Sequence, residues 1–242
     1  MQQHLSSRTV REYEWYVRRW ESAGFPDPAA WVEVFAGAHQ RRNARAALLW
    51  HHRTNLRTPL SLEPQHALRK VPVAFTQEEL HRLLKKAHMV HARCEPVLQL
   101  LYSTGARVNE AAGITPEDIT STHIILKETK RRPGGLRVER PIPLGRRSRQ
   151  ALADLAGMPL GRVQNVIGVR AHTVQDWCRD VSKLTEMHVH AHKLRATFCT
   201  HLLQRGVPVH EVRVLMGHTD LATTLRYAAV TDKRLASAVA LL

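Results

Sequence analysis

The chain has 242 residues, of which 43% are apolar, so it can bury a core in one large domain or two small ones and is not disordered throughout. Lys and Arg number 36 against 21 Asp and Glu, a formal net charge of +15. This excess indicates a polyanionic partner, most simply nucleic acid, although ribosomal, chromatin and membrane-surface proteins share it. Three scattered cysteines do not provide a disulfide framework or a Cys-x-x-Cys metal site. With neither a membrane-spanning apolar run nor a signal peptide, we expect a cytoplasmic protein with no membrane partner.

The N-terminal part of the chain is predicted to form a small helical domain over residues 1–62. Apolar residues recur at helical spacing over 8–22, and similar patterns follow over 28–35 and 39–56. Between residues 57 and 73 the periodicity breaks in a stretch that contains three prolines, and we expect a linker over 63–73.

The remaining residues, 74–242, are predicted to form a second, mainly helical domain with one β-hairpin, an α+β fold. Thr76 and Glu79 have the spacing of a capping box, which predicts that a helix begins there. Further helices are expected up to about Leu101, followed by a turn at Gly105. The residues rich in Ile, Val and Leu at 122–127 and 138–144 flank Arg-Pro-Gly-Gly turn chemistry and predict the hairpin. Later helices are expected over 147–156, 163–169, 173–184, 192–205, 209–216 and 221–230, and an amphipathic helix over 231–242.

Five side chains have the chemistry needed to break and rejoin a phosphodiester through a covalent tyrosyl link: Arg107, His192, Arg195, His218 and Tyr227. A tyrosine hydroxyl has a pKa of about 10, so it needs a base or a strongly cationic setting to act as a nucleophile. Paired guanidinium groups match the oxygens of a phosphate, and they stay protonated at working pH.

The intervals between these residues resemble those of the tyrosine site-specific recombinases, the family of phage integrases, Xer, Cre and their relatives. The segment LLYSTGARVNEAAGI, residues 100–114, resembles the first arginine box, with Arg107 in the arginine position and Glu110 three residues later. HAHKLRATFCTHLLQRG resembles the second box, with its His-x-x-Arg pattern. LMGHTDLATTLRY resembles the third, in which Tyr227 follows His218 by nine residues. Histidine at this third-box position, where Cre has tryptophan, fits the Xer and integrase branches.

The predicted hairpin resembles the one that carries a catalytic lysine in this family. Lys130 fits the length of the hairpins in relatives, and Lys127 is the alternative. Glu110 could be a surface acid on its helix, but we favour a buried partner that orients the catalytic arginines.

The resemblance implies a helical, SAM-like core-binding domain and a catalytic domain with the DNA breaking-rejoining fold, which close as a clamp around double-stranded DNA. Tyr227 would attack the scissile phosphate to give a 3′-phosphotyrosyl bond and a free 5′-hydroxyl. Arg107 and Arg195 would hold the non-bridging oxygens, and His218 would add a hydrogen bond.

The same resemblance assigns the proton transfers and the partners of the reaction. His192 would assist proton removal from the tyrosine, and Lys130 would protonate the leaving 5′-oxygen. Neither ATP, metal nor another cofactor would be needed, because the covalent link conserves the bond energy. Strand exchange would pass through a Holliday junction in a homotetramer, with a possible directionality or DNA-bending factor. We expect a core-site recombinase of a phage, plasmid or other mobile element, without an arm-type DNA-binding domain.

Two other functions remain open at this point. A relative that has kept the fold but lost catalysis would only bind DNA, and a type IB topoisomerase would use a similar catalytic set to relax supercoils. Alternation of His188, His190 and His192 could also suggest a metal site, but no cysteine completes it, so we expect these histidines to be surface or DNA-proximal residues.

Overall fold

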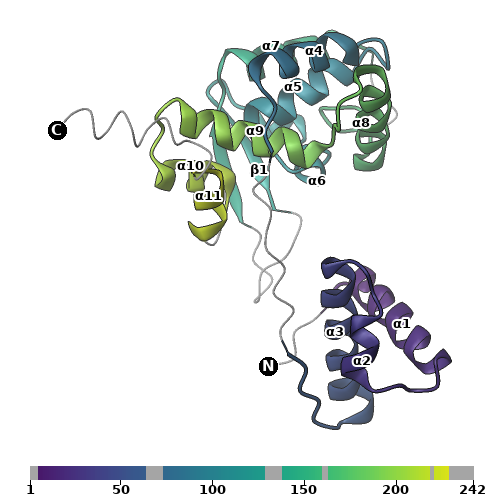
Figure 1. Ribbon diagram of the computed structural model, residues 1–242. Helices are drawn as coiled ribbons and strands as arrows, with labels where there is room; N and C mark the ends of the chain where they lie inside the picture. The colour runs from purple at the N-terminus through teal and green to yellow at the C-terminus, as the bar shows by residue number, and fades with distance from the viewer. Residues whose placement is uncertain (1–4, 64–72, 129–137, 160–162, 219–220, 229–242) are drawn as a thin grey trace. The chain divides into compact units, whose positions relative to one another are not determined.

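The computed structural model describes residues 5–63, 73–128, 138–159, 163–218 and 221–228. The chain forms two compact units, residues 1–70 and 71–242 (Figure 1). Each unit has its own buried core.

The N-terminal unit is a bundle of three helices: α1 (Ser7–Ser22), α2 (Pro28–Glu33) and α3 (Ala38–His51). The side chains of Ser6 and Asp27 cap the first two helices by accepting hydrogen bonds from backbone N–H groups of the first turn. The helices predicted over 8–22 and 28–35 are confirmed to within two residues. The third is confirmed as α3 followed by one π-helical turn, His52–Leu56. Aromatic and aliphatic side chains fill the core of this bundle: Tyr16, Val17, Trp20, Trp31, Val32, Phe35, Ala44, Ala47, Leu48 and Leu62.

The C-terminal unit begins with two helices that precede the first arginine segment, α4 (Gln77–Ala87) and α5 (Cys94–Thr104). The predicted capping box is confirmed: the Thr76 hydroxyl accepts from the Glu79 N–H at 3.1 Å, and the Glu79 carboxylate accepts from the Thr76 N–H at 2.8 Å. Helix α5 ends at Gly105, which has a φ of 62° and is the αL residue that terminates the helix.

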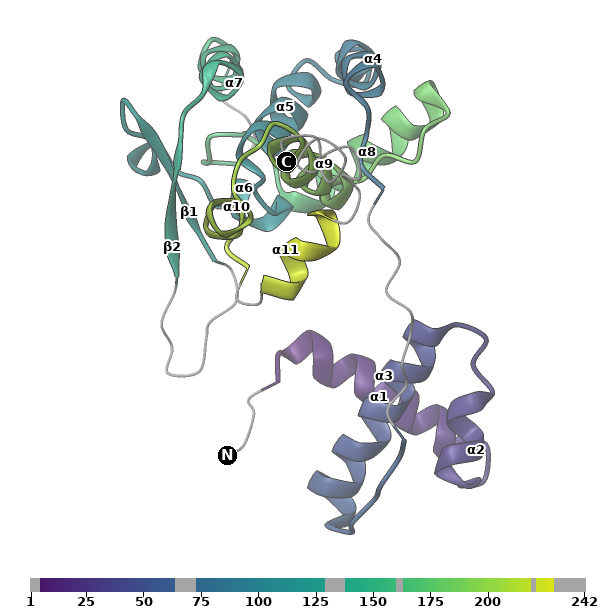
Figure 2. The ribbon, with the colours of Figure 1, turned by 60° about the vertical axis from the view of Figure 1, so that its left-hand side comes forward.

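A two-stranded antiparallel sheet confirms the predicted hairpin. Strand β1 (His123–Lys127) pairs with β2 (Glu139–Pro143), and Leu126 lies opposite Arg140. Figure 2 shows both strands at one side of the unit, near α10. Because side chains alternate along a strand, Arg140 and Ile142 point into the protein while their neighbours on β2 are exposed.

The other elements of this unit are mostly those that the sequence predicted: α6 (Val108–Ala111), the 3-10 turn Pro116–Asp118, α7 (Arg146–Ala156), α8 (Ala171–Thr185), α9 (Ala191–Gln204), α10 (Val209–Met216) and α11 (Leu221–Ala228).

The helix predicted over 163–169 is wrong, because the described residues there form turns and bends. Gly168 has a φ of 69°, which ends any helical path, and the Asn165 amide donates to the carbonyls of Ala112 and Val169. Burial of the apolar residues in this turn produced a pattern that resembled a helix. The predicted helix over 231–242 lies outside the described residues.

Phe75 is tied to α9 at the start of this unit. Its N–H donates to the Thr197 hydroxyl at 3.0 Å, and its carbonyl accepts from His201 Nε2 at 2.9 Å. The Nδ1 atom of the same imidazole therefore acts as the acceptor for the Tyr102 hydroxyl at 3.0 Å. The Lys193 ammonium also lies 3.9 Å from the centre of the Phe75 ring.

No helix in the described ranges has both the length and the apolar character to cross a bilayer. The three cysteines are free thiols, and each is buried.

We predict that Gly105→Ala destabilises the protein, whereas Gly157→Ala does not. A Cβ atom at position 105 would lie 2.4 Å from Phe198 Cδ1 on a backbone with positive φ, so the expected loss is about 2–4 kcal/mol. Position 157 has a φ of −75°, and a Cβ atom there meets nothing closer than 3.6 Å. Denaturant unfolding of the two variants measures the difference, and equal stabilities would contradict this account of the turn.

Candidate active site

Arg107 lies at the N-cap of the short helix α6, directly after the Gly105 turn. Its N–H donates to Glu110 Oε2 at 2.8 Å, and its Nη1 donates to Glu110 Oε1 at 2.6 Å. The side chain of Arg107 is 38% exposed, whereas that of Glu110 is 1% exposed. The predicted burial of Glu110 against Arg107 is therefore confirmed, and Arg107 is fixed in orientation while part of its side chain stays exposed.

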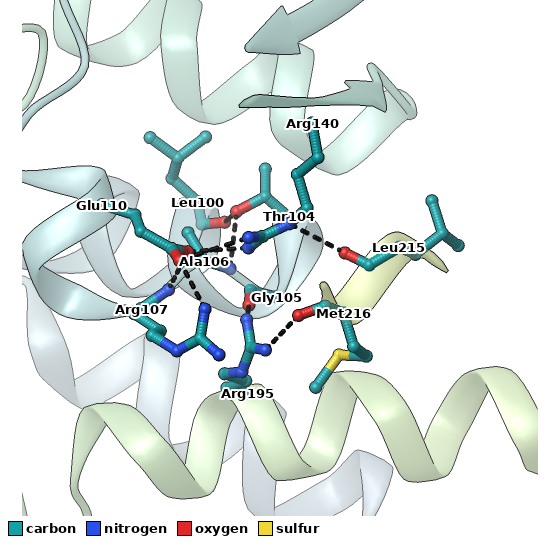
Figure 3. Close-up of polar contacts among 10 residues, drawn as sticks. All are labelled: Leu100, Thr104, Gly105, Ala106, Arg107, Glu110, Arg140, Arg195, Leu215 and Met216. Atoms are coloured by element: carbon teal, nitrogen blue, oxygen red, sulfur yellow. Dashed lines mark hydrogen bonds and ion pairs between the residues drawn. The ribbon is translucent and has the colours of Figure 1, made fainter. Parts of the chain in front are cut away.

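Arg195 lies in the second turn of α9 and is almost completely buried. Its Nη1 donates to the carbonyl of Gly105, and its Nη2 donates to the carbonyl of Met216, as Figure 3 shows. Burial lowers the pKa of Arg195 to about 10, and the positive charges of Arg107 and Arg140 add to this effect. The group remains charged at neutral pH and joins the ends of α5 and α10.

His192 lies one helical turn before Arg195, in the first turn of α9. Desolvation by the surrounding protein lowers the pKa of His192, and the positive charges of Arg195 and Arg107 lower it further. A lowered pKa keeps the imidazole neutral at neutral pH, and only the neutral form can accept a proton.

His218 and Tyr227 lie side by side. The two rings are stacked at an interplanar angle of 14°, with their centres 6.4 Å apart, and His218 Nδ1 lies 2.9 Å from the Thr224 hydroxyl oxygen. The Tyr227 ring is 6% exposed and packs in the small core formed with α9 and α10. Ala196, the residue after Arg195, belongs to the same core, so Tyr227 packs beside the part of α9 that carries this arginine.

Arg140 on β2 is a polar residue of the site that the sequence did not predict. Its guanidinium donates to both oxygens of Glu110, at 2.7 and 3.2 Å, and its Nε donates to the Leu215 carbonyl at 3.1 Å. One signal was present in the sequence, since an arginine stands at an inward-facing position of a strand, next to the equally inward Ile142.

Of the two candidate lysines, the structure describes only Lys127. Lys130 lies outside the described residues. Lys127, at the end of β1, forms an ion pair with Asp118 at 2.5 Å, and this hydrogen bond raises the pKa of Lys127. Asp118 thus draws the Lys127 ammonium toward the Pro116–Asp118 turn.

Of the three alternating histidines, His188 and His190 lie beside each other near the start of α9. The rings of His188 and His190 lie 5.0 Å apart, and His190 Nδ1 caps α9 by accepting from the Lys193 N–H at 3.1 Å. Among the described residues, no group of three or more His, Cys, Asp or Glu side chains is arranged to hold a metal ion.

Residues 74–234, more than half of the chain, match the phage integrase family. The chain belongs to the phage integrase family. This match includes the segments that carry Arg107, Arg195 and Tyr227.

Relatives in this family and solved structures agree with the match. Tyrosine recombinase XerC of Staphylococcus saprophyticus is 33% identical over 187 residues, which cover 68% of this chain and 60% of the relative. The chain therefore spans less than two thirds of the length of that protein. XerA recombinase has a TM-score of 0.57 at 22% identity, covering 98% of this chain and 92% of that one. A lambda integrase tetramer bound to a Holliday junction has a TM-score of 0.74 at 15% identity, covering 93% and 72%. The predicted fold class, mainly helical with a small antiparallel sheet, is confirmed.

We predict that Glu110→Gln lowers stability in a pH-dependent way. Burial alone would raise the pKa of Glu110, but hydrogen bonds and positive charge from Arg140, then hydrogen bonds from Arg107, hold it below its ordinary value. Such a carboxylate stabilises the fold above its unfolded pKa, and this contribution is lost as the pH falls through the lower, folded pKa. At pH 7 we expect a loss of about 3 kcal/mol, because two guanidinium groups lose their counter-charge.

Unfolding free energies of the wild type and the variant, measured from pH 7 to below the ordinary glutamate range, test this prediction. The gap should shrink only in the acid part of that range. Glu211→Gln, at an exposed position of α10, is the control and should follow the wild type. A gap that stays constant with pH would contradict the ionised, arginine-paired carboxylate.

Proposed function

We propose that the chain is a site-specific DNA recombinase that cleaves and rejoins DNA strands through a 3′-phosphotyrosyl intermediate. The observation that carries the proposal is the meeting of Arg107 and Arg195 at the Gly105 turn, with Tyr227 packed in the same small core as Ala196, the residue after Arg195. Membership of the phage integrase family supports the same reaction.

In this proposal the two arginines stabilise the phosphate as its charge concentrates in the transition state. Arg107 is oriented by Glu110 and partly exposed, so it can bind a non-bridging oxygen directly. Arg195 supplies a buried positive charge close to the tyrosine, and His218 donates a hydrogen bond to the same phosphate. Buried, fixed charges stabilise a transition state well because they need no reorganisation during the reaction.

Proton transfer is assigned to two further groups. The lowered pKa of His192 supports a role in accepting the Tyr227 proton, because the imidazole is neutral at neutral pH. Lys130 donates a proton to the leaving 5′-oxygen. The ion pair between Lys127 and Asp118 supports Lys130 as the acid, since it holds the alternative lysine elsewhere.

The proposed partners are double-stranded DNA at core recombination sites and three further copies of the chain. The net charge of +15 supports a polyanionic partner, and the solved lambda integrase tetramer on a Holliday junction supports the assembly. We assign DNA binding to both units, with catalysis in residues 74–242 and a core-binding role for residues 1–62. A directionality or DNA-bending factor would set the direction of recombination.

We predict that Tyr227→Phe abolishes covalent complex formation and retains DNA binding, because it removes only the nucleophilic oxygen. Nicked duplexes with a randomised core are incubated with the wild type, and the adducts that survive denaturation are recovered and sequenced. The enriched duplex then serves as the substrate for the variants. Tyr102→Phe, which loses a buried hydroxyl bonded to His201, is the matched control and should still form the adduct.

Three results would contradict the proposal in different ways. Absence of any wild-type adduct would favour a DNA-binding protein without catalysis. An adduct formed by Tyr227→Phe would show that another residue is the nucleophile. Relaxation of supercoiled plasmid without strand exchange between sites would favour a type IB topoisomerase.

We predict that a bridging 5′-sulfur restores cleavage by Lys130→Ala. Loss of a general acid should slow cleavage of the ordinary substrate by about 10²–10⁴-fold, whereas a thiolate leaves without being protonated. Single-turnover rates on both substrates measure the rescue. Lys127→Ala is the comparison, and a rescue confined to that variant would assign the acid to Lys127 instead.

A further inference from the structure

Arg140 is buried at a position where a strand normally places an apolar side chain. It is 6% exposed, and on the same face of β2 lies Ile142, which is 1% exposed. Removing a guanidinium from water costs several kcal/mol unless its N–H groups are bonded and its charge is compensated. The contacts of Arg140 therefore have to account for its burial.

Both Nη atoms of Arg140 donate to Glu110 in a bidentate contact. The same carboxylate orients Arg107. Glu110 Oε2 accepts from Arg140 Nη2 at 2.7 Å and from the Arg107 N–H at 2.8 Å. Glu110 Oε1 accepts from Nη1 of both arginines, at 3.2 Å for Arg140 and 2.6 Å for Arg107. A displacement of Arg140 would therefore reach Arg107 through one shared carboxylate (Figure 3).

The Nε atom of Arg140 contacts the end of α10, where the segment that resembles the third box begins. Arg140 Nε donates to the Leu215 carbonyl, one residue before the carbonyl of Met216 that Arg195 uses. Gly217 then adopts a φ of 60°, and a Cβ atom there would lie 2.9 Å from Arg140 Nη1. The guanidinium thus packs against the turn that leads directly to His218.

The charges of this cluster have a consequence for phosphate binding. Paired with Arg107 alone, Glu110 would cancel the charge that has to face the phosphate. Arg140 supplies a second cation to the same carboxylate, so the three arginines and one glutamate keep a net charge of +2. Arg140 does not reach the phosphate itself in this arrangement, because its Nε and both of its Nη atoms are bonded inside the protein.

We propose that Arg140 is a positioning residue for strand cleavage, which compensates the charge of Glu110 and holds the hairpin and the Gly217 turn in register with Arg107. This inference rests on the proposed recombinase function. Arg140 acts through Arg107 and the turn before His218, and as part of β2 it also anchors the strand that follows the Lys130 loop.

The test compares Arg140→Met, Arg140→Lys and the double variant Arg140→Met with Glu110→Gln, on the duplex recovered with the wild type. Arg140→Met should slow single-turnover cleavage by about 10- to 100-fold, the range known for partners that orient metal ligands, and leave DNA binding close to wild type. Adding Glu110→Gln should restore about tenfold of the rate, because it removes the uncompensated carboxylate beside Arg107. The cleavage rate of Arg140→Lys should lie between those of the wild type and Arg140→Met, since an ammonium keeps the charge but cannot make the bidentate contact.

Arg149→Met is the matched control. In the described part of the chain its guanidinium bonds backbone carbonyls at the base of the hairpin, those of Leu144 and Ser121, so cleavage should stay close to the wild-type rate. Melting curves establish the temperature at which every variant is folded. If Arg140→Met does not fold, Arg140→Lys and the double variant decide the question.

Three outcomes separate the two proposals. Absence of a wild-type adduct overturns the recombinase function. A wild-type adduct together with full cleavage by Arg140→Met overturns only the role of Arg140. A double variant slower than Arg140→Met would also overturn it, because removal of the carboxylate would then not have relieved the loss caused by Arg140→Met.

Discussion

Repulsion among three guanidinium groups is the constraint that the site has to satisfy. Arg107, Arg140 and Arg195 lie close together, and burial first, then the charges of the other two arginines, lower the pKa of Arg195. Glu110 offsets one of the three charges. The remaining N–H groups that are paired donate to backbone carbonyls, which satisfy hydrogen bonds without neutralising charge. The cluster is thereby held in place and still keeps a surplus of positive charge.

Two of these carbonyls come from helix ends of the same kind. Helix α5 ends at Gly105 and α10 ends at Gly217, both in the αL conformation. The last carbonyls of a helix lack partners within it and lie at the negative end of its dipole, so they accept readily from cations. Arg195 bonds to a carbonyl at each of the two helix ends. Carbonyls at two helix ends that terminate in glycine therefore accept the hydrogen bonds that order the site.

Local patterns in the sequence predicted what depends on neighbouring residues along the chain. The Thr76 capping box and the hairpin were found in this way, and resemblance to a family supplied the candidate catalytic residues. Arg140 was missed because its partners, Glu110 and Leu215, are far away in sequence and only the fold brings them together. The helix predicted over 163–169 was wrong for a related reason. Its apolar residues are buried by tertiary packing of a turn, which periodicity alone does not distinguish from a helix face.

The hydrogen bonds of Phe75 connect the start of the C-terminal unit directly to α9. The backbone of Phe75 is held on both sides, by Thr197 through its N–H and by His201 through its carbonyl. Both partners are on the helix that carries His192 and Arg195. A force on the chain at Phe75 therefore acts on α9 through these two hydrogen bonds, in addition to acting along the backbone on α4.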